Sequence, residues 1–174
     1  MNCRTTYSRF STMIFSILKS LALGVWLGAL IMLGYAVAGP IFQHSPSKTV
    51  AGTINGIILG RMNTIEWVCW TVALVSSILL LVLHWSGARG LRVAELTLIV
   101  VAGALLWIYS IRITARMETL RTMIGDFDHP RADTEYVAAK TEFDSLHHTY
   151  TAIVSTNMIL VLGAFTLSII TVKQ

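Results

Sequence analysis

Charged side chains are scarce in this sequence. They make up 13% of its 174 residues, whereas 55% are hydrophobic. A soluble domain usually carries charge on roughly a quarter of its residues, so about half of the expected charged surface is missing. This shortage argues against an ordinary soluble domain and indicates that much of the chain faces lipid. The length predicts a single domain, residues 1–174.

Dense basic clusters, cysteine pairs and catalytic motifs are also lacking. The net charge is only +4 and the basic residues are scattered, whereas a nucleic-acid groove needs a stripe of Lys and Arg, so we expect no nucleic-acid partner. The two cysteines, Cys3 and Cys69, are not expected to form a disulfide, because Cys69 lies in an apolar stretch where a free thiol behaves as a small hydrophobe. No motif specifies a reaction, so the sequence favours a protein that is not an enzyme.

What the sequence does contain is four long apolar runs, near 12–38, 62–84, 93–113 and 150–172. A helix needs about 20 mainly apolar residues to cross the hydrocarbon core of a bilayer. We therefore predict an all-α fold, a four-transmembrane-helix bundle that forms a single integral membrane domain in a lipid bilayer.

Residues near the ends of these runs predict where the helices begin and end. Lys19 lies early in the first run, where its long stem is expected to reach the membrane interface, and Pro40 is expected to stop that helix. Ser45 and Pro46 predict the next helix start, as cap and first-turn residue. His84, with the tryptophan after it, is typical of the opposite interface.

The first run has a second interpretation, as a cleaved signal peptide. The residues at 36–38 (Ala-Val-Ala) follow a basic start and resemble a cleavage site. The run is too long for a typical signal core, and Gly24 and Gly28 give it a surface for close packing. We therefore favour a retained membrane helix.

The third helix is expected to continue beyond the membrane. Arg112, Arg116 and Arg121 recur near helical spacing, and an apolar stripe runs between them at Ile113, Met117, Leu120 and Ile124. Gly125 is a candidate C-terminal cap, and Asp133 or Thr134 is a candidate cap for the next helix. The helix after this turn reads as an amphipathic arm that packs back on the third, so we predict helical extensions on the outer side.

The distribution of basic residues predicts the orientation. The termini and the link between the second and third helices carry basic residues with hardly any acids, namely Arg4, Arg9, Lys19, Arg89, Arg92 and Lys173. Short basic segments stay on the cytoplasmic side. We therefore expect a bacterial inner-membrane protein with both termini in the cytoplasm and the helical extensions outside.

Glycines recur at intervals of four in the second helical segment. Gly52, Gly56 and Gly60 line one face of a helix and permit close contact between backbones, as Gly24 and Gly28 do in the first. A phosphate-binding loop would need a preceding strand and a following Lys-Ser/Thr pair, and neither is present. These faces predict packing against another membrane subunit or a second copy of the chain.

One group of polar residues is expected near the outer end of the bundle. Glu66 lies one turn inside the second run, and Arg112 and Arg116 lie at the same end of the antiparallel third helix. An ion pair would lower the cost of holding charge near hydrocarbon. Tyr150, at the mouth of the fourth run, is expected to join this polar cluster.

The histidines allow a metal-site hypothesis. His147 and His148 are adjacent, so their side chains diverge by about 100° on a helix and a metal would need a further ligand. His44 is the most accessible by topology, and the further donors are Met62, Glu66 and Asp144. Imidazole and thioether ligands suit copper, and an axial histidine suits haem. The alternative is that His147 only hydrogen-bonds within a polar cluster, to Glu66 or Tyr150. His147 is expected to point into the bundle with Phe143, and His148 to point outward.

Three stretches of the sequence together resemble a known family. GVWLGALIMLGYAVAGPIF, TVAGTINGIILGRM and FDSLHHTY are similar to the transmembrane-protein-205-like family, small four-helix membrane proteins of unsettled role, at Trp26, Gly28, Pro40, Phe42, Ala51, Gly52, Gly56, Phe143, Leu146 and His147. The likeness spans about residues 15–165. The family's Ser and Asn in the turns after its histidine are replaced here by Tyr150 and Val154, with Asn157 one turn later. A more distant likeness is to the copper-resistance D proteins and the four-helix membrane protoporphyrinogen oxidases, which implies metal or haem handling by architecture alone.

Two functions follow from these features. The first is a small non-enzymatic membrane protein, a structural or accessory subunit that packs against a larger complex or itself. The alternative is a copper- or haem-binding membrane protein that uses His147 with His44 or His148.

Overall fold

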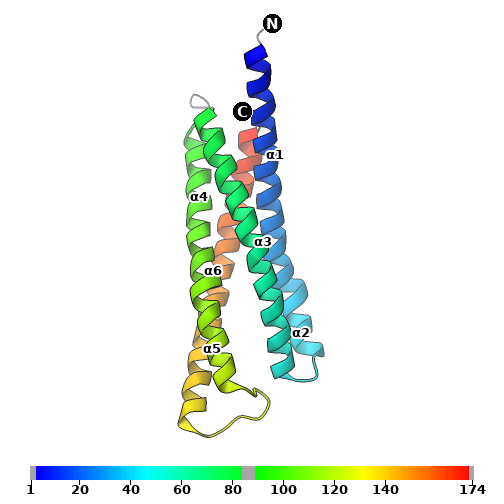
Figure 1. Ribbon diagram of the computed structural model, residues 1–174, viewed down its shortest axis with the longest axis vertical. Coiled ribbons are helices and arrows are strands. Elements are labelled where there is room, and N and C mark those ends of the chain that lie inside the picture. The colour runs from blue at the N-terminus through cyan, green and yellow to red at the C-terminus, as the bar shows by residue number, and fades with distance from the viewer. Residues whose placement is uncertain (1–2, 84–88, 173–174) are drawn as a thin grey trace.

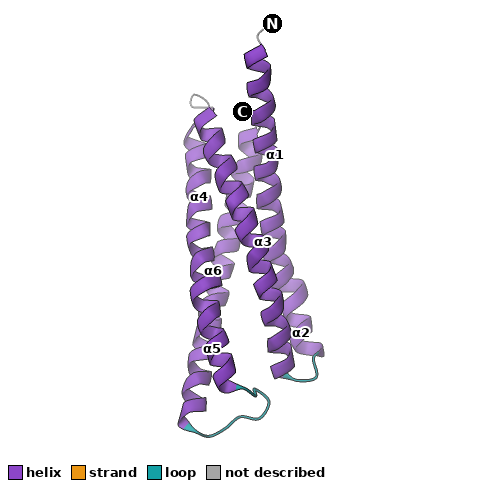
Figure 2. Ribbon diagram, viewed as in Figure 1, coloured by secondary structure: helices purple, strands orange, loops and turns teal. Residues whose placement is uncertain are grey.

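The computed structural model describes residues 3–83 and 89–172, and its secondary structure in these ranges is helical (Figure 1). The elements in chain order are α1 (Cys3–Ile31), η1 (Met32–Val37), α2 (Ala38–His44), α3 (Lys48–Leu83), α4 (Arg89–Trp107), η2 (Ile108–Ile113), α5 (Thr114–Ile124) and α6 (Thr134–Val172). No strand occurs in the described ranges (Figure 2). The predicted all-α class is confirmed.

Four helical runs, over residues 11–44, 48–83, 89–124 and 134–171, are long and apolar enough to cross a membrane. The protein is therefore an integral membrane protein built as a four-helix bundle. The start of α1 and the end of α6 lie together at one end of the bundle, here called the terminal end (Figure 1). The opposite end, here called the loop end, carries the turns at 45–47 and 125–133.

The four runs form a ring in which α1 and α4 each pack against both α3 and α6. The helices α1 and α4 therefore face each other across the bundle axis. The core at their centre is closed by side chains with no exposed surface: Leu23, Trp26, Ala73, Ile99, Ala102, Leu106, Tyr109, Val161 and Ala164.

At the loop end, α5 packs against the first turns of α6, as the apolar stripe predicted. A second core forms there from Leu120, Ile124, Tyr136 and Ala139. Gly125, with a φ of 69°, ends α5, and the Asp133 carboxylate accepts the backbone N–H of Tyr136 at 2.8 Å and caps α6. The predicted helical extension is confirmed.

Pro40 does not stop the first helix, contrary to prediction. The preceding residues form a π-helical turn, η1, in which the backbone N–H of Ala38 donates to the carbonyl of Leu33. Proline lacks an N–H and its ring crowds the carbonyl four residues earlier, and we attribute the wider turn to this strain. The chain then stays helical to His44.

The residue that caps α3 lies two positions later than predicted, at Ser47 instead of Ser45. Ser45 is extended and ends α2, whereas the Ser47 hydroxyl accepts the backbone N–H of Val50 at 3.1 Å and so caps α3. The interface prediction for His84 and Trp85, and the charge assigned to Lys173, lie outside the described residues.

Candidate functional site

A hydrogen-bonded group of polar side chains lies inside the bundle, around the buried Glu66. The Tyr109 hydroxyl donates to the carboxylate of Glu66, and the Asn157 side-chain N–H donates to the Tyr109 oxygen at 3.1 Å. Glu66 is 2% exposed, and Tyr109 and Asn157 are 0% exposed. Three different elements, α3, η2 and α6, thus meet in one buried polar cluster.

The π-helical turn η2 carries Tyr109 in this cluster. In this wider turn the Tyr109 carbonyl accepts the backbone N–H of Thr114, five residues later, instead of the N–H four residues later. The Thr114 hydroxyl donates to the same carbonyl at 2.7 Å. The neighbouring Ser110 accepts the indole N–H of Trp67 from α3 at 3.2 Å. These bonds fix η2 against α3. Single π turns are frequent at functional sites.

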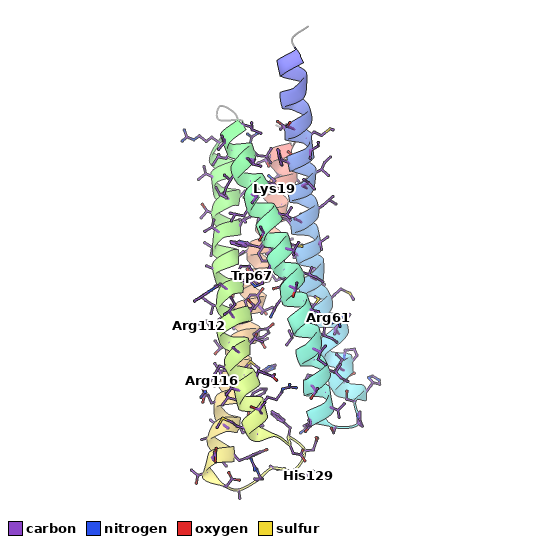
Figure 3. All side chains as sticks on the ribbon, in the orientation of Figure 1. Lys19, Arg61, Trp67, Arg112, Arg116 and His129 are labelled. Carbon is purple, nitrogen blue, oxygen red and sulfur yellow. The ribbon has the colours of Figure 1, made fainter. Side chains whose placement is uncertain are left out.

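The two arginines expected beside Glu66 lie elsewhere. Arg112 is exposed and places its guanidinium over the ring of Trp107, 5.5 Å from its centroid. Arg116 is exposed and pairs through two 2.7 Å hydrogen bonds with Glu142 on α6. Both project at the outer edge of the bundle (Figure 3). The predicted ion pair to Glu66 is therefore replaced by the hydrogen bond from Tyr109.

Tyr150 does lie beside the cluster. Its ring packs edge-on against Tyr109, with 5.7 Å between the centroids. Tyr109 itself was missed by the sequence analysis, although it continues the buried stripe of α4 after Ile99 and Leu106 at spacings of seven and three. That spacing was the available signal, because a tyrosine on an apolar stripe needs a polar partner for its hydroxyl.

A second buried polar group lies nearer the terminal end (Figure 3). Lys19 is not at an interface, as its long stem suggested, but is 3% exposed, and its Nζ lies 2.8 Å from each carboxylate oxygen of Glu95. The Thr171 hydroxyl is 3.5 Å from the same carboxylate. The ion pair joins α1 and α4 across the bundle axis, and it neutralises both charges in the core.

The histidines are not brought together as a metal site. His147 and His148 are both exposed, so His147 does not turn inward as predicted, and their rings lie 6.3 Å apart. His44, on α2, is exposed and its Nδ1 lies 3.0 Å from the Pro40 carbonyl within its own turn. Within residues 3–83 and 89–172 no group of three or more His, Cys, Asp or Glu side chains could hold a metal ion.

The predicted packing glycines differ in their surroundings. A Cβ at Gly24 would lie 3.4 Å from the Phe165 ring, so this glycine supports packing within the chain. A Cβ at Gly56 would meet only the end of the Arg121 side chain, at 3.9 Å. Gly28, Gly52 and Gly60 face open space, with nothing within 4 Å of the added Cβ.

A third polar group joins the turn 125–133 to the start of α3 at the loop end. The Asp128 carboxylate accepts the backbone N–H groups of Lys48 and Thr49 at 2.8 and 3.1 Å. Asp126 accepts the Asp128 N–H and lies 2.8 Å from the His129 ring nitrogen. These bonds lower the pKa of Asp126 to about 2, first through His129, and raise the pKa of His129 through Asp126.

We expect the Asp126–His129 pair to stabilise the turn 125–133 most between about pH 4 and pH 6.5. The lowered pKa of Asp126 means that its contribution is present above the usual value of 3.8 and is lost as the pH falls towards 2. The raised pKa of His129 means that its contribution is present below 6.5 and is lost as the pH rises through the raised value. An NMR titration of the His129 ring should show the raised pKa, and Asp126→Asn should return it towards 6.5. An unchanged titration in that variant would show that the pair does not form in solution.

Comparison with known proteins relates the chain to a family of membrane-like helical proteins through a family model. A family model described as a domain of unknown function (DUF4149) matches residues 21–124, which run from α1 to the end of α5 and include Glu66, Glu95 and Tyr109. No curated protein and no solved structure matches the chain.

Proposed function

The chain belongs to the DUF4149 family, whose function is unknown, and we propose that it is a small non-enzymatic membrane protein, a structural or accessory subunit. In this role it packs against the helices of a larger membrane complex or of a second copy. The sequence resemblance to the transmembrane-protein-205-like family agrees with this proposal, because that family also consists of small four-helix membrane proteins.

The glycine face of α3 (Gly52, Gly56 and Gly60) is the observation that supports this function. Apart from the adjacent backbone of α3 itself, no atom of the described chain lies within 4 Å of a Cβ at Gly52 or Gly60, and Gly60 is exposed. Glycines at intervals of four on a membrane helix allow another helix to approach closely. Since the other described helices leave Gly52 and Gly60 open, and Gly56 meets only the end of the Arg121 side chain, the partner for close packing on this face is another molecule.

The proposed location is a bacterial inner membrane with the terminal end in the cytoplasm. Exposed arginines support the position of the opposite boundary: Arg61 on α3 and Arg112 on η2 lie at a similar level in the bundle (Figure 3), and long basic side chains gather at membrane interfaces. The turn 125–133 then lies outside. Reporter fusions after Asp128 and after the C-terminus distinguish this orientation from its inverse.

We expect Gly60→Leu to weaken assembly by about 5-fold to 150-fold, because overpacking costs about 1–3 kcal/mol. The new side chain meets open space within the chain, so the thermal stability of the single chain should be unchanged. The assembled mass is measured on native gels after extraction in a mild detergent, beside the thermal stability of the same sample.

Ala104→Leu on α4 is the matched control, because it adds similar bulk at an exposed position away from the glycine face. It should assemble like the parent protein. The proposal is wrong if Gly60→Leu assembles normally, or if the parent protein runs as a lone 19.2 kDa chain in the mildest detergents.

The copper- or haem-binding alternative is tested with the same purified protein. An optical spectrum and a metal analysis should show neither haem absorption nor stoichiometric copper if the protein is a structural subunit. One haem or one copper per chain, lost in His147→Ala, would favour the alternative function.

A further inference from the structure

The buried carboxylates Glu66 and Glu95 differ in the groups that compensate their negative charge. Glu95 has the ammonium group of Lys19 at 2.8 Å from both of its oxygens. Glu66 is equally buried, yet in the described ranges no Lys, Arg or His lies within 4.0 Å of its carboxylate. Its hydrogen-bond donor is the neutral hydroxyl of Tyr109.

An ionised carboxylate without a cation is costly in the interior of a membrane protein. The titratable groups that face Glu66 are Cys69 on its own helix, Tyr109 on η2 and Tyr150 on α6. All three carry no charge in their protonated forms, and α1 brings its buried cation, Lys19, to Glu95 instead. Among the described residues no cation lies close enough to neutralise an ionised Glu66, so its charge has to be neutralised by another positive ion.

A second observation at the same cluster also indicates such an ion. The side-chain oxygen of Asn157 is buried and has no hydrogen-bond donor, although the N–H of the same carboxamide donates to Tyr109. A buried acceptor without a donor costs about 1–3 kcal/mol. The N–H end of this amide is fixed by its bond to Tyr109, so the cluster that contains Glu66 keeps one hydrogen-bond acceptor unfilled.

We propose that Glu66, Tyr109 and Asn157 bind one exchangeable proton inside the bundle. The proton adds to the Glu66 carboxylate and converts it to a neutral carboxyl group, and the Tyr109 hydroxyl keeps its own proton in both states. A proton fits this cluster better than a sodium ion, because the Tyr109 oxygen is already engaged as donor and acceptor. Few oxygens then remain to surround a metal ion.

The position of Glu66 indicates from which side the proton arrives. Glu66 lies five residues, or about 7.5 Å along a helix, further into the bundle than the exposed Arg61. Tyr109 lies one turn inside the exposed Arg112. The cluster is thus close to the loop-end boundary, whereas the Lys19–Glu95 pair lies near the terminal end. Exchange with the loop-end side is the short route, and this inference does not depend on the proposed packing function.

Infrared difference spectroscopy of the parent protein in lipid nanodiscs tests the proposal. Between about pH 4 and pH 10, a carboxyl C=O band should appear as the pH falls, and it should be lost in Glu66→Gln. Glu142→Gln, which removes an exposed carboxylate on α6, is the control and should keep the band. If no pH-dependent band is lost in Glu66→Gln, Glu66 holds no exchangeable proton and the proposal is overturned.

Tyr109→Phe tests the same proposal without removing the carboxyl group. Loss of the hydroxyl removes the donor to the ionised form, so the proton should be bound about tenfold more tightly. Identical proton affinity in this variant would overturn the role of Tyr109, even if Glu66→Gln fails to fold. A band that responds to added sodium at constant pH, and not to pH, would overturn the proton as the occupant.

Discussion

Replacing Lys19 with methionine should destabilise the folded bundle by about 3–5 kcal/mol, the cost of breaking a buried ion pair by removing one partner. The reason is that Glu95 is 1% exposed and would keep the Thr171 hydroxyl, at 3.5 Å, in place of an ammonium group at 2.8 Å. Glu95 can lower the cost by taking up a proton, which places the result towards the lower end of the range. The free energy of unfolding in mixed detergent–lipid micelles measures the effect.

The double variant Lys19→Met with Glu95→Met separates loss of the charge pair from loss of packing. Buried ion pairs replaced by apolar residues of similar volume are often neutral or more stable, so the second substitution should restore most of the lost stability. Lys140→Met is the control, because it breaks an exposed pair with Asp144 on α6 and should cost at most about 1 kcal/mol. A Lys19→Met protein as stable as its parent would show that the pair contributes nothing.

The Lys19–Glu95 pair shows why the interior of this bundle could not be predicted from the sequence. Each residue lies near the end of an apolar run, where a charged side chain ordinarily reaches the interface. They meet because α1 and α4 face each other across the bundle axis, with both side chains turned inward. Hydropathy gives the length of each helix, but it does not give the rotation of two helices that are not neighbours in the ring.

The four helices themselves were predictable, because a bilayer crossing depends on the length of an apolar run alone. Local signals were also sufficient for Gly125 and Asp133, whose capping roles depend on a few adjacent residues. The π turn at Ile108–Ile113 was not predictable from such signals, and it carries Tyr109 into the site while Arg112 stays exposed. The predicted ion pair of Glu66 failed for this reason.

Gly103 is a position whose importance only the packed structure reveals. A Cβ added there would lie 2.0 Å from the indole nitrogen of Trp70, far inside contact distance. Moving Trp70 aside would cost free energy, because its N–H donates to the Ile99 carbonyl at 3.1 Å. Its ring also packs edge-on against Trp67, with 5.3 Å between centroids. The close approach of α3 and α4 thus depends on the missing side chain.

We therefore expect Gly103→Ala to destabilise the bundle by about 2–4 kcal/mol, from overpacking plus the lost Trp70 hydrogen bond. Gly90→Ala on the same helix is the control: its Cβ meets nothing within 4 Å, so it should be neutral or stabilise by about 0.5–1 kcal/mol. Unfolding free energies of the two alanine variants give the comparison directly. Adding Trp70→Phe to Gly103→Ala should recover part of the loss, because the smaller ring leaves room for the methyl group. If Gly103→Ala matches Gly90→Ala in stability, α3 and α4 do not approach each other at this position as closely as the structure has them.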